Sequence, residues 1–92
     1  MTNTHQVTLM VLDVLKPHEP SILDLSKKIG TVAGISGVDI TIMSVDRKVE
    51  TAKVTIEGTG FSYDKILKII NDYGATVKSI DRVATGKKLV TG

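Results

Sequence analysis

The alternation of strand-like and helix-like hydrophobic patterns is the feature that most constrains the fold of this chain. Residues 6–16 are apolar at both odd and even positions and rich in β-branched side chains, which is typical of a central strand. Residues 38–45 and 51–58 instead alternate apolar with polar side chains, as strands with one buried face do. Residues 75–84 follow as a fourth expected strand.

Two amphipathic segments separate these strands. Apolar residues recur every three or four positions over residues 21–33 and again after Ser62, which is helical spacing. Ser21 and Ser62 are expected to be N-caps, because a hydroxyl at that position accepts from a free backbone N–H of the first turn. Gly34 and Gly74 are expected to end the two helices.

The resulting order is βαββαβ, and its two halves resemble each other. Residues 44–47 (SVDR) recur as residues 79–82 (SIDR) at matching places in the two halves. Right-handed crossovers place the first and third strands in the middle of the sheet. We therefore expect an α+β, ferredoxin-like sandwich, in which an antiparallel four-stranded sheet ordered 4-1-3-2 carries two helices on one face. A single domain is expected over 1–92, with its core over about 6–84 and a short tail over 85–92.

Composition excludes several classes of function. The chain has no cysteine, which excludes disulfides, thiolate nucleophiles, zinc ribbons and iron–sulfur clusters. Twelve Lys and Arg nearly balance ten Asp and Glu, and the few aromatic residues argue against nucleic-acid binding. No apolar run approaches the roughly 20 residues that span a bilayer, and no signal-peptide pattern is present. We expect a cytoplasmic protein without a nucleic-acid or membrane partner.

The segment Lys16–Pro20 (KPHEP), between the first strand and the first helix, is the first candidate site. His18 and Glu19 have the chemistry of an acid–base pair, of metal ligands, or of a small-anion site at a helix start. A structural joint explains the same residues, because Pro17 ends the strand and Ser21 caps the helix. We favour the joint, with anion binding as its functional alternative.

The helix-free face of the sheet is the second candidate site. If Ile42 pairs with Val54, Asp39 lies directly opposite Glu57, and two facing carboxylates repel each other. Solvent, a lysine of a neighbouring subunit or a bound cation would relieve that repulsion. Hard oxygen ligands favour Ca²⁺ or Mg²⁺, so Asp39 and Glu57 are the candidate metal ligands.

An apolar patch with one carboxylate is expected on the same helix-free face. Such patches commonly mark contacts with other proteins. Lys53 or Lys78 is expected to neutralise the carboxylate. The candidate interface residues are Leu9, Val11, Asp13, Met43 and Val45.

Four segments carry a resemblance to a known family. LDVLKPHEPSI, GVDIT, VTIEG and SIDRV resemble the archaeal family called domain of unknown function 211, and the likeness runs over residues 7–90. The resemblance implies a ferredoxin-like fold, self-association into rings or other homo-oligomers, and no assigned activity. The family pattern has His and Glu where this chain has Lys78 and Arg82, and Asn where it has Asp39, which argues against a polar site on the last strand.

These observations favour a non-enzymatic homo-oligomeric protein that binds a divalent cation or a small anion. The alternative is a regulatory domain like the ACT fold, which binds an amino acid or another small effector at a subunit interface. The chain lacks the Gly-rich anion loop of acylphosphatases, and it contains neither a Walker motif nor a Gly-x-Ser-x-Gly motif. We therefore do not expect an enzyme.

Overall fold

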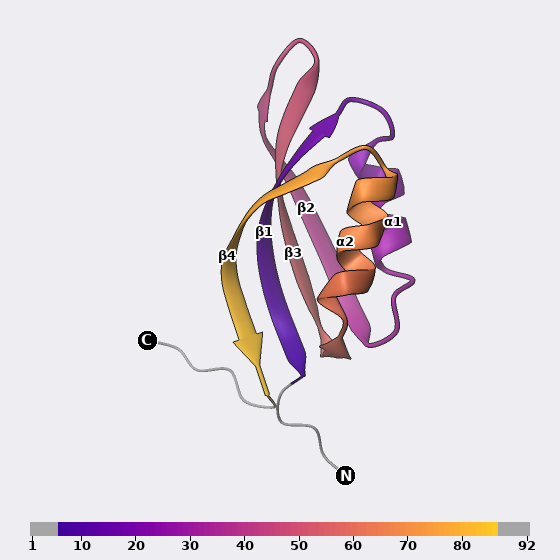
Figure 1. Cartoon of the computed structure of the whole chain (residues 1–92), viewed down its shortest axis with the longest axis vertical. Helices are drawn as coiled ribbons and strands as arrows, with labels where there is room; N and C mark the ends of the chain where they lie inside the picture. Colours follow the sequence, from indigo (N-terminus) through magenta and orange to yellow (C-terminus); the bar gives the residue numbers. More distant parts are fainter. Residues whose placement is uncertain (1–5, 87–92) are drawn as a thin grey trace.

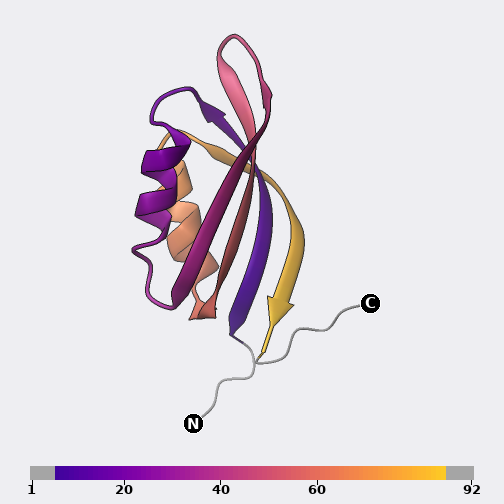
Figure 2. The ribbon, with the colours of Figure 1, turned by 180° about the vertical axis from the view of Figure 1, so that it is seen from behind.

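Six elements follow one another in the expected order (Figure 1). The computed structural model describes residues 6–86. Its four strands form one antiparallel sheet in the order β2-β3-β1-β4, which is the expected 4-1-3-2 order read from the opposite edge. Both helices lie side by side on one face of that sheet (Figures 1 and 2), so the ferredoxin-like α+β fold is confirmed. The elements are β1 (Val7–Pro17), α1 (Ile22–Ile29), β2 (Ile35–Val45), β3 (Val49–Phe61), α2 (Tyr63–Asp72) and β4 (Thr76–Thr85).

The two expected N-caps are both confirmed. The Ser21 hydroxyl accepts a hydrogen bond from the backbone N–H of Asp24 at 3.2 Å, and the Ser62 hydroxyl accepts one from that of Lys65 at 3.4 Å. Each hydroxyl satisfies one of the backbone donors that a helix start leaves free.

The first helix ends earlier than its apolar pattern predicted. Its C-cap is Gly30 rather than Gly34, and the chain then turns through hydrogen bonds between residues three apart. The Thr31 hydroxyl donates to the carbonyl of Lys28 at 2.6 Å, so a side chain takes up an acceptor that a continuing helix would use. Val32 is still buried, which is why the apolar spacing continued past the true end of the helix.

The core lies between the sheet and the helices. Even-numbered residues of β1 point towards α1 and α2, because successive side chains of a strand face opposite sides. The central strand β3 contributes its own alternate residues to the same layer. The fully buried members of this core are Leu12, Val14, Leu25, Ile29, Val54, Ile56, Ile66 and Ile70.

The pairing of β2 with β3 differs from the expected register by two residues. Ile42 lies opposite Ala52 rather than Val54, and Asp39 lies opposite Thr55 rather than Glu57. A tight turn sets this register, because the backbone N–H of Asp46 donates to the carbonyl of Val49 at 2.8 Å. The expectation of two directly opposed carboxylates is therefore wrong.

An irregularity at Met43 places Val45 on the other face of the sheet. The register shifts between Ile42 and Ser44, after which Val45 lies opposite Glu50. Glu50 also lies opposite Lys16, an even-numbered residue of β1 on the helix side. Val45 is exposed, as expected, but not beside Leu9 and Val11, because an extra residue in a strand reverses the facing of those that follow.

The helix-free face of β1 is less exposed than its sequence indicated. Leu9 and Val11 are only 5% and 8% exposed, although no helix of residues 6–86 covers them. Arg82 lies opposite Val11 and Glu57 lies opposite Leu9, and long side chains of this kind cover apolar neighbours with their methylene groups. Leu9 and Val11 are therefore covered in the single chain, whereas Met43 is 60% exposed, and an interface at these residues remains a prediction.

Candidate functional site

A buried lysine lies where β1 ends. Strand alternation directs Lys16 to the helix side of the sheet, and the residue is only 1% exposed. Its ammonium nitrogen lies 2.6 Å from the carbonyl oxygen of Pro17, 3.4 Å from that of His18 and 3.1 Å from Oε1 of Glu50. Three donors thus have three acceptors, which is the condition under which a buried charge is tolerated.

Glu50 links Lys16 to His18, which lies in the connection between β1 and α1. It lies opposite Lys16 in the pairing of β1 with β3, near the start of β3. One carboxylate oxygen accepts from Lys16, and the other lies 3.0 Å from Nδ1 of His18. The hydrogen bond from His18, followed by that from Lys16, lowers the pKa of the Glu50 carboxyl. Glu50 is therefore held as a carboxylate between two donors.

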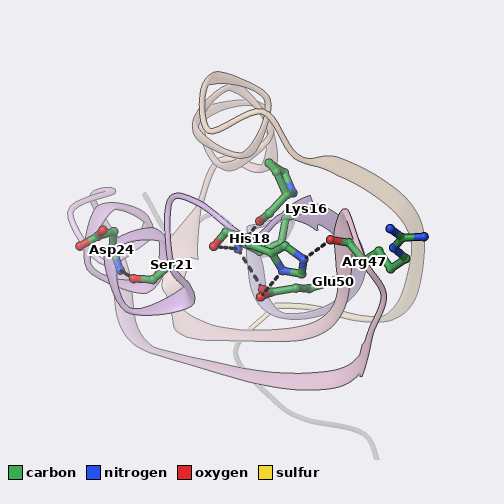
Figure 3. Close-up of polar contacts among 7 residues, drawn as sticks. Lys16, His18, Ser21, Asp24, Arg47 and Glu50 are labelled. Atoms are coloured by element: carbon green, nitrogen blue, oxygen red, sulfur yellow. Dashed lines mark hydrogen bonds and ion pairs between the residues drawn. The ribbon is translucent and has the colours of Figure 1, made fainter.

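The imidazole of His18 lies between two acceptors (Figure 3). Its Nδ1 faces the Glu50 carboxylate at 3.0 Å, and its Nε2 faces the backbone carbonyl oxygen of Arg47 at 3.0 Å. Both partners only accept, so the ring satisfies both when each nitrogen carries a proton. The Glu50 hydrogen bond first, and then the Arg47 carbonyl, raise the pKa of His18.

We call these three side chains the Lys16–His18–Glu50 cluster. It joins the end of β1, the β1–α1 connection and the turn between β2 and β3. Lys16 and His18 belong to the KPHEP segment and Glu50 to β3, so the joint between β1 and α1 has a polar centre that is completed by a distant strand. His18 pairs with Glu50 and not with its neighbour Glu19, which is exposed.

The sequence pointed to His18 and Glu19 as the candidate side chains of the Lys16–Pro20 segment, and not to Lys16 or Glu50. One signal for Lys16 was available, because it occupies an even position in a strand whose other even positions are core residues. Glu50 gave no comparable signal, since it lies 32 residues from His18 in the chain. Both ring nitrogens of His18 face protein acceptors, so a small anion or a metal would have to displace one of them. Ligand binding at His18 and Glu19 remains a prediction.

The two candidate metal ligands lie diagonally on the helix-free face. Asp39 faces Thr55, two residues from Glu57 on β3, and Glu57 faces Gly37. The Thr41 hydroxyl lies 3.5 Å from Oδ1 of Asp39. Across residues 6–86, no three His, Cys, Asp or Glu side chains are grouped so that they could hold a metal ion. Cation binding at Asp39 and Glu57 remains a prediction with two protein ligands.

Asp13 has a cation opposite it, as the sequence indicated. Lys53 is its partner on β3, and Ser79 is its partner on β4. The Ser79 hydroxyl donates to Oδ1 of Asp81 at 2.7 Å. The pairing places Asp13 and Lys53 opposite each other on the two central strands, but the ion pairs formed within residues 6–86 do not include Asp13, so neutralisation of this carboxylate remains a prediction.

Exposed apolar side chains gather at the two edges of the sheet. Ile80 and Val83 of β4 are 46% and 50% exposed, and they lie opposite the core residues Leu12 and Met10. They therefore face the helix side of the sheet. At the other edge, a groove runs between α1 and β2, and Leu23 at its rim is exposed. The groove is lined by Ile22, Leu23, Ser26, Val38 and Ile40.

These features define an α+β sandwich of the ferredoxin-like class, with β2 and β4 at the edges of its sheet and a buried ion pair at the end of β1. Residues 8–92 match the family domain of unknown function 211, which is described as an uncharacterised ArCR. The chain is also 47% identical, over 81 residues, to an uncharacterised protein of Methanocaldococcus jannaschii, covering 88% of this chain and 84% of that protein. The chain belongs to this family, and the resemblance noted in its sequence is confirmed. Within residues 6–86, no helix is long and apolar enough to span a membrane.

Proposed function

We propose that the protein is a non-enzymatic module that assembles with further copies of itself through its two edge strands. The observation that carries this proposal is the position of its exposed apolar side chains. Ile80 and Val83 on β4, and Leu23 beside β2, are exposed on the same side of the sheet at opposite edges. Exposed apolar groups of this kind are stabilised by contact with another molecule.

The backbone of the edge strands supports the same proposal. β2 and β4 contain 11 and 10 residues, and their outer N–H and C=O groups face away from the sheet. Neither strand contains proline, and β2 carries Asp39 as its only charged residue, whereas β4 carries Lys78, Asp81 and Arg82. Proteins that avoid edge pairing commonly place proline or several charges on such strands. β2 is therefore suited to accept a further strand.

The two edges complement each other. If β4 of one copy pairs with β2 of the next, Ile80 and Val83 are directed towards the α1–β2 groove, because both features lie on the helix side. This contact uses two different surfaces, so it is heterologous and generates a closed ring or an open filament. The expected self-association into rings follows from this arrangement if the rotation closes.

The oligomeric state is the direct test. We expect native mass spectrometry and light scattering to show a defined species larger than a monomer at micromolar concentration. A monomer at every concentration tested would contradict the proposal.

The chain's lack of cysteine allows the contact itself to be tested. Thr41→Cys on β2 and Ser79→Cys on β4 each add one exposed thiol on the helix-free side. We expect a short bis-maleimide to link the two variants when they are mixed, and to link neither variant alone. Linking within Thr41→Cys alone would indicate β2–β2 pairing instead.

Ligand binding is the second part of the proposal. Asp39 and Glu57 are the ligands for Ca²⁺ or Mg²⁺, since they share one face of the β2–β3 pair. We expect these cations to raise the melting temperature of the wild-type protein but not of Asp39→Asn/Glu57→Gln. No response to any divalent cation would contradict this part. A response to amino acids alone would favour a regulatory domain of the ACT type.

A further inference from the structure

We propose that His18 is a pH-dependent switch that holds the β2–β3 turn against the β1–α1 connection and releases it when the imidazole loses a proton. The two segments are distant in sequence: His18 contacts the Arg47 carbonyl 29 residues away and the Glu50 carboxylate 32 residues away. The inference does not depend on self-association, because every contact lies within one chain.

The geometry defines two states. With both nitrogens protonated, the ring donates to Glu50 and to Arg47 at 3.0 Å each. A neutral imidazole has one N–H and one lone pair, so one nitrogen must then face an acceptor oxygen without a proton between them. Two electron-rich atoms at that distance repel each other. Loss of one proton therefore breaks one of the two contacts.

The contact to Arg47 is the one we expect to break. A hydrogen bond to a carboxylate is stronger than one to a neutral carbonyl, so the remaining proton stays on Nδ1, facing Glu50. Glu50 is also held in place by Lys16, whose ammonium lies 3.1 Å from its other oxygen. The Arg47 carbonyl is on an exposed turn, which can move away from the ring. Deprotonation thus frees the turn while the Lys16–Glu50 pair stays.

The charges around His18 are few. From β3 the ring faces the Glu50 carboxylate, which favours the charged imidazole. From β1, Lys16 shares that carboxylate and opposes a second positive charge nearby. The turn contributes its backbone at Asp46 and Arg47, and the Arg47 and Lys48 side chains are exposed. Glu19, on the same connection as His18, is exposed as well.

The turn has internal hydrogen bonds that do not involve His18. The N–H of Asp46 donates to the carbonyl of Val49, and the N–H of Arg47 donates to the Asp46 carboxylate at 2.7 Å. We therefore expect the released turn to keep its local shape while it loses its fixed position. The backbone of Arg47 is then no longer held against the β1–α1 connection.

Nuclear magnetic resonance of the whole chain can test this switch between pH 5 and 9. A His5→Gln background leaves one imidazole to follow. We expect the amide signals of Arg47 and Lys48 to shift with the same midpoint as the His18 ring, and that midpoint to lie above the ordinary histidine value. We also expect their hydrogen exchange, corrected for base catalysis, to increase severalfold above the midpoint.

Three variants separate the switch from a general effect of pH. In His18→Gln, the pH-dependent shift of the turn amides should disappear. Glu50→Gln should lower the His18 midpoint, whereas Glu19→Gln, which removes an exposed neighbouring carboxylate, should leave it nearly unchanged. The proposal would be overturned if the amide signals of the turn did not change with the His18 titration. It would also be overturned if Glu19→Gln and Glu50→Gln shifted the His18 midpoint equally. If Glu50→Gln does not fold, the His18→Gln comparison decides.

Discussion

At the scale of single residues, the buried ammonium of Lys16 depends on its partners. A charge in a protein interior is tolerated only when hydrogen bonds and an opposite charge replace its hydration. Pro17 and His18 supply two carbonyl oxygens, and Glu50 supplies the opposite charge. The KPHEP segment thus positions two acceptors through its backbone, which its side-chain chemistry does not reveal.

We expect removal of Glu50 and removal of Lys16 to lower the free energy of unfolding by different amounts. Glu50→Ala leaves the Lys16 ammonium buried without its counter-charge, and we expect a loss of about 2 kcal/mol in the free energy of unfolding, since Glu50 is partly exposed. Lys16→Met removes the buried charge and keeps most of the volume, so a smaller loss is expected. Urea denaturation of both variants checks this order. A larger loss in Lys16→Met would contradict it.

The cluster also gives the stability of the fold a defined pH dependence. The pKa of Glu50 is lowered on folding, so its contribution is complete above about pH 4.5 and is lost as the pH falls further. The pKa of His18 is raised, so its contribution is complete below about pH 6.5 and is lost as the pH rises through the folded value. We therefore expect the highest melting temperature between these limits.

Calorimetry at a series of pH values measures this profile. His18→Gln should remove part of the fall on the alkaline side and leave a carboxylate-dependent fall on the acidic side. If the melting temperature of His18→Gln falls at alkaline pH as much as that of the wild-type protein, groups other than His18 cause that fall.

At the scale of elements, the α1–β2 connection approaches β3 closely through glycines. The Thr59 N–H donates to the Gly34 carbonyl at 2.8 Å, and a Cβ at Gly58 would lie 2.0 Å from that same oxygen. Gly34 itself has a φ of +90°, which few residues with a side chain adopt. The two backbones can lie this close only because these positions lack a Cβ.

A matched pair of glycine variants tests this contact. Gly58→Ala forces a backbone shift, and we expect it to lower the free energy of unfolding by about 2 to 4 kcal/mol. Gly37→Ala, on the paired strand, places its methyl group in open space with no atom within 4 Å, so we expect little change. Chemical denaturation of the two proteins provides the comparison, and equal losses would contradict the steric explanation.

At the scale of the whole molecule, exposed apolar side chains lie at the two edges of the sheet. Ile80 and Val83 lie on the helix side of β4 and are 46% and 50% exposed. The same strand carries Ser79 on the opposite face. The proposed assembly therefore uses the apolar side chains on the helix side of β4 and not Ser79 on its helix-free side.

Ile80→Lys and Ser79→Lys add the same charge to neighbouring positions on opposite faces. Both residues are exposed, so we expect the stability of the single chain to change by less than about 0.5 kcal/mol in each. We expect Ile80→Lys to reduce the assembled fraction strongly, and Ser79→Lys to reduce it less, as measured by light scattering. Equal behaviour of the two variants would exclude the helix-side contact.

Hydrophobic periodicity and helix N-caps were sufficient to predict the architecture. The segment order, both serine N-caps and the 4-1-3-2 sheet follow from hydrophobic spacing and crossover handedness, which are properties of short stretches of sequence. The end of α1 was predicted too late, since Val32 continues the apolar spacing beyond the helix. The end of a helix depends on which donors bind its last carbonyl groups. At the end of α1, the Thr31 hydroxyl donates to the Lys28 carbonyl and so competes with backbone N–H groups.

The sequence by itself thus determined the family and the order of the elements. Only the tertiary structure decided the β2–β3 register, the reversal of Val45 and the contact of His18 with Glu50. A turn hydrogen bond at Asp46 and one extra residue at Met43 fix the first two. The third joins residues 32 apart, and no local pattern encodes such a pairing, because it arises only when two strands have been aligned.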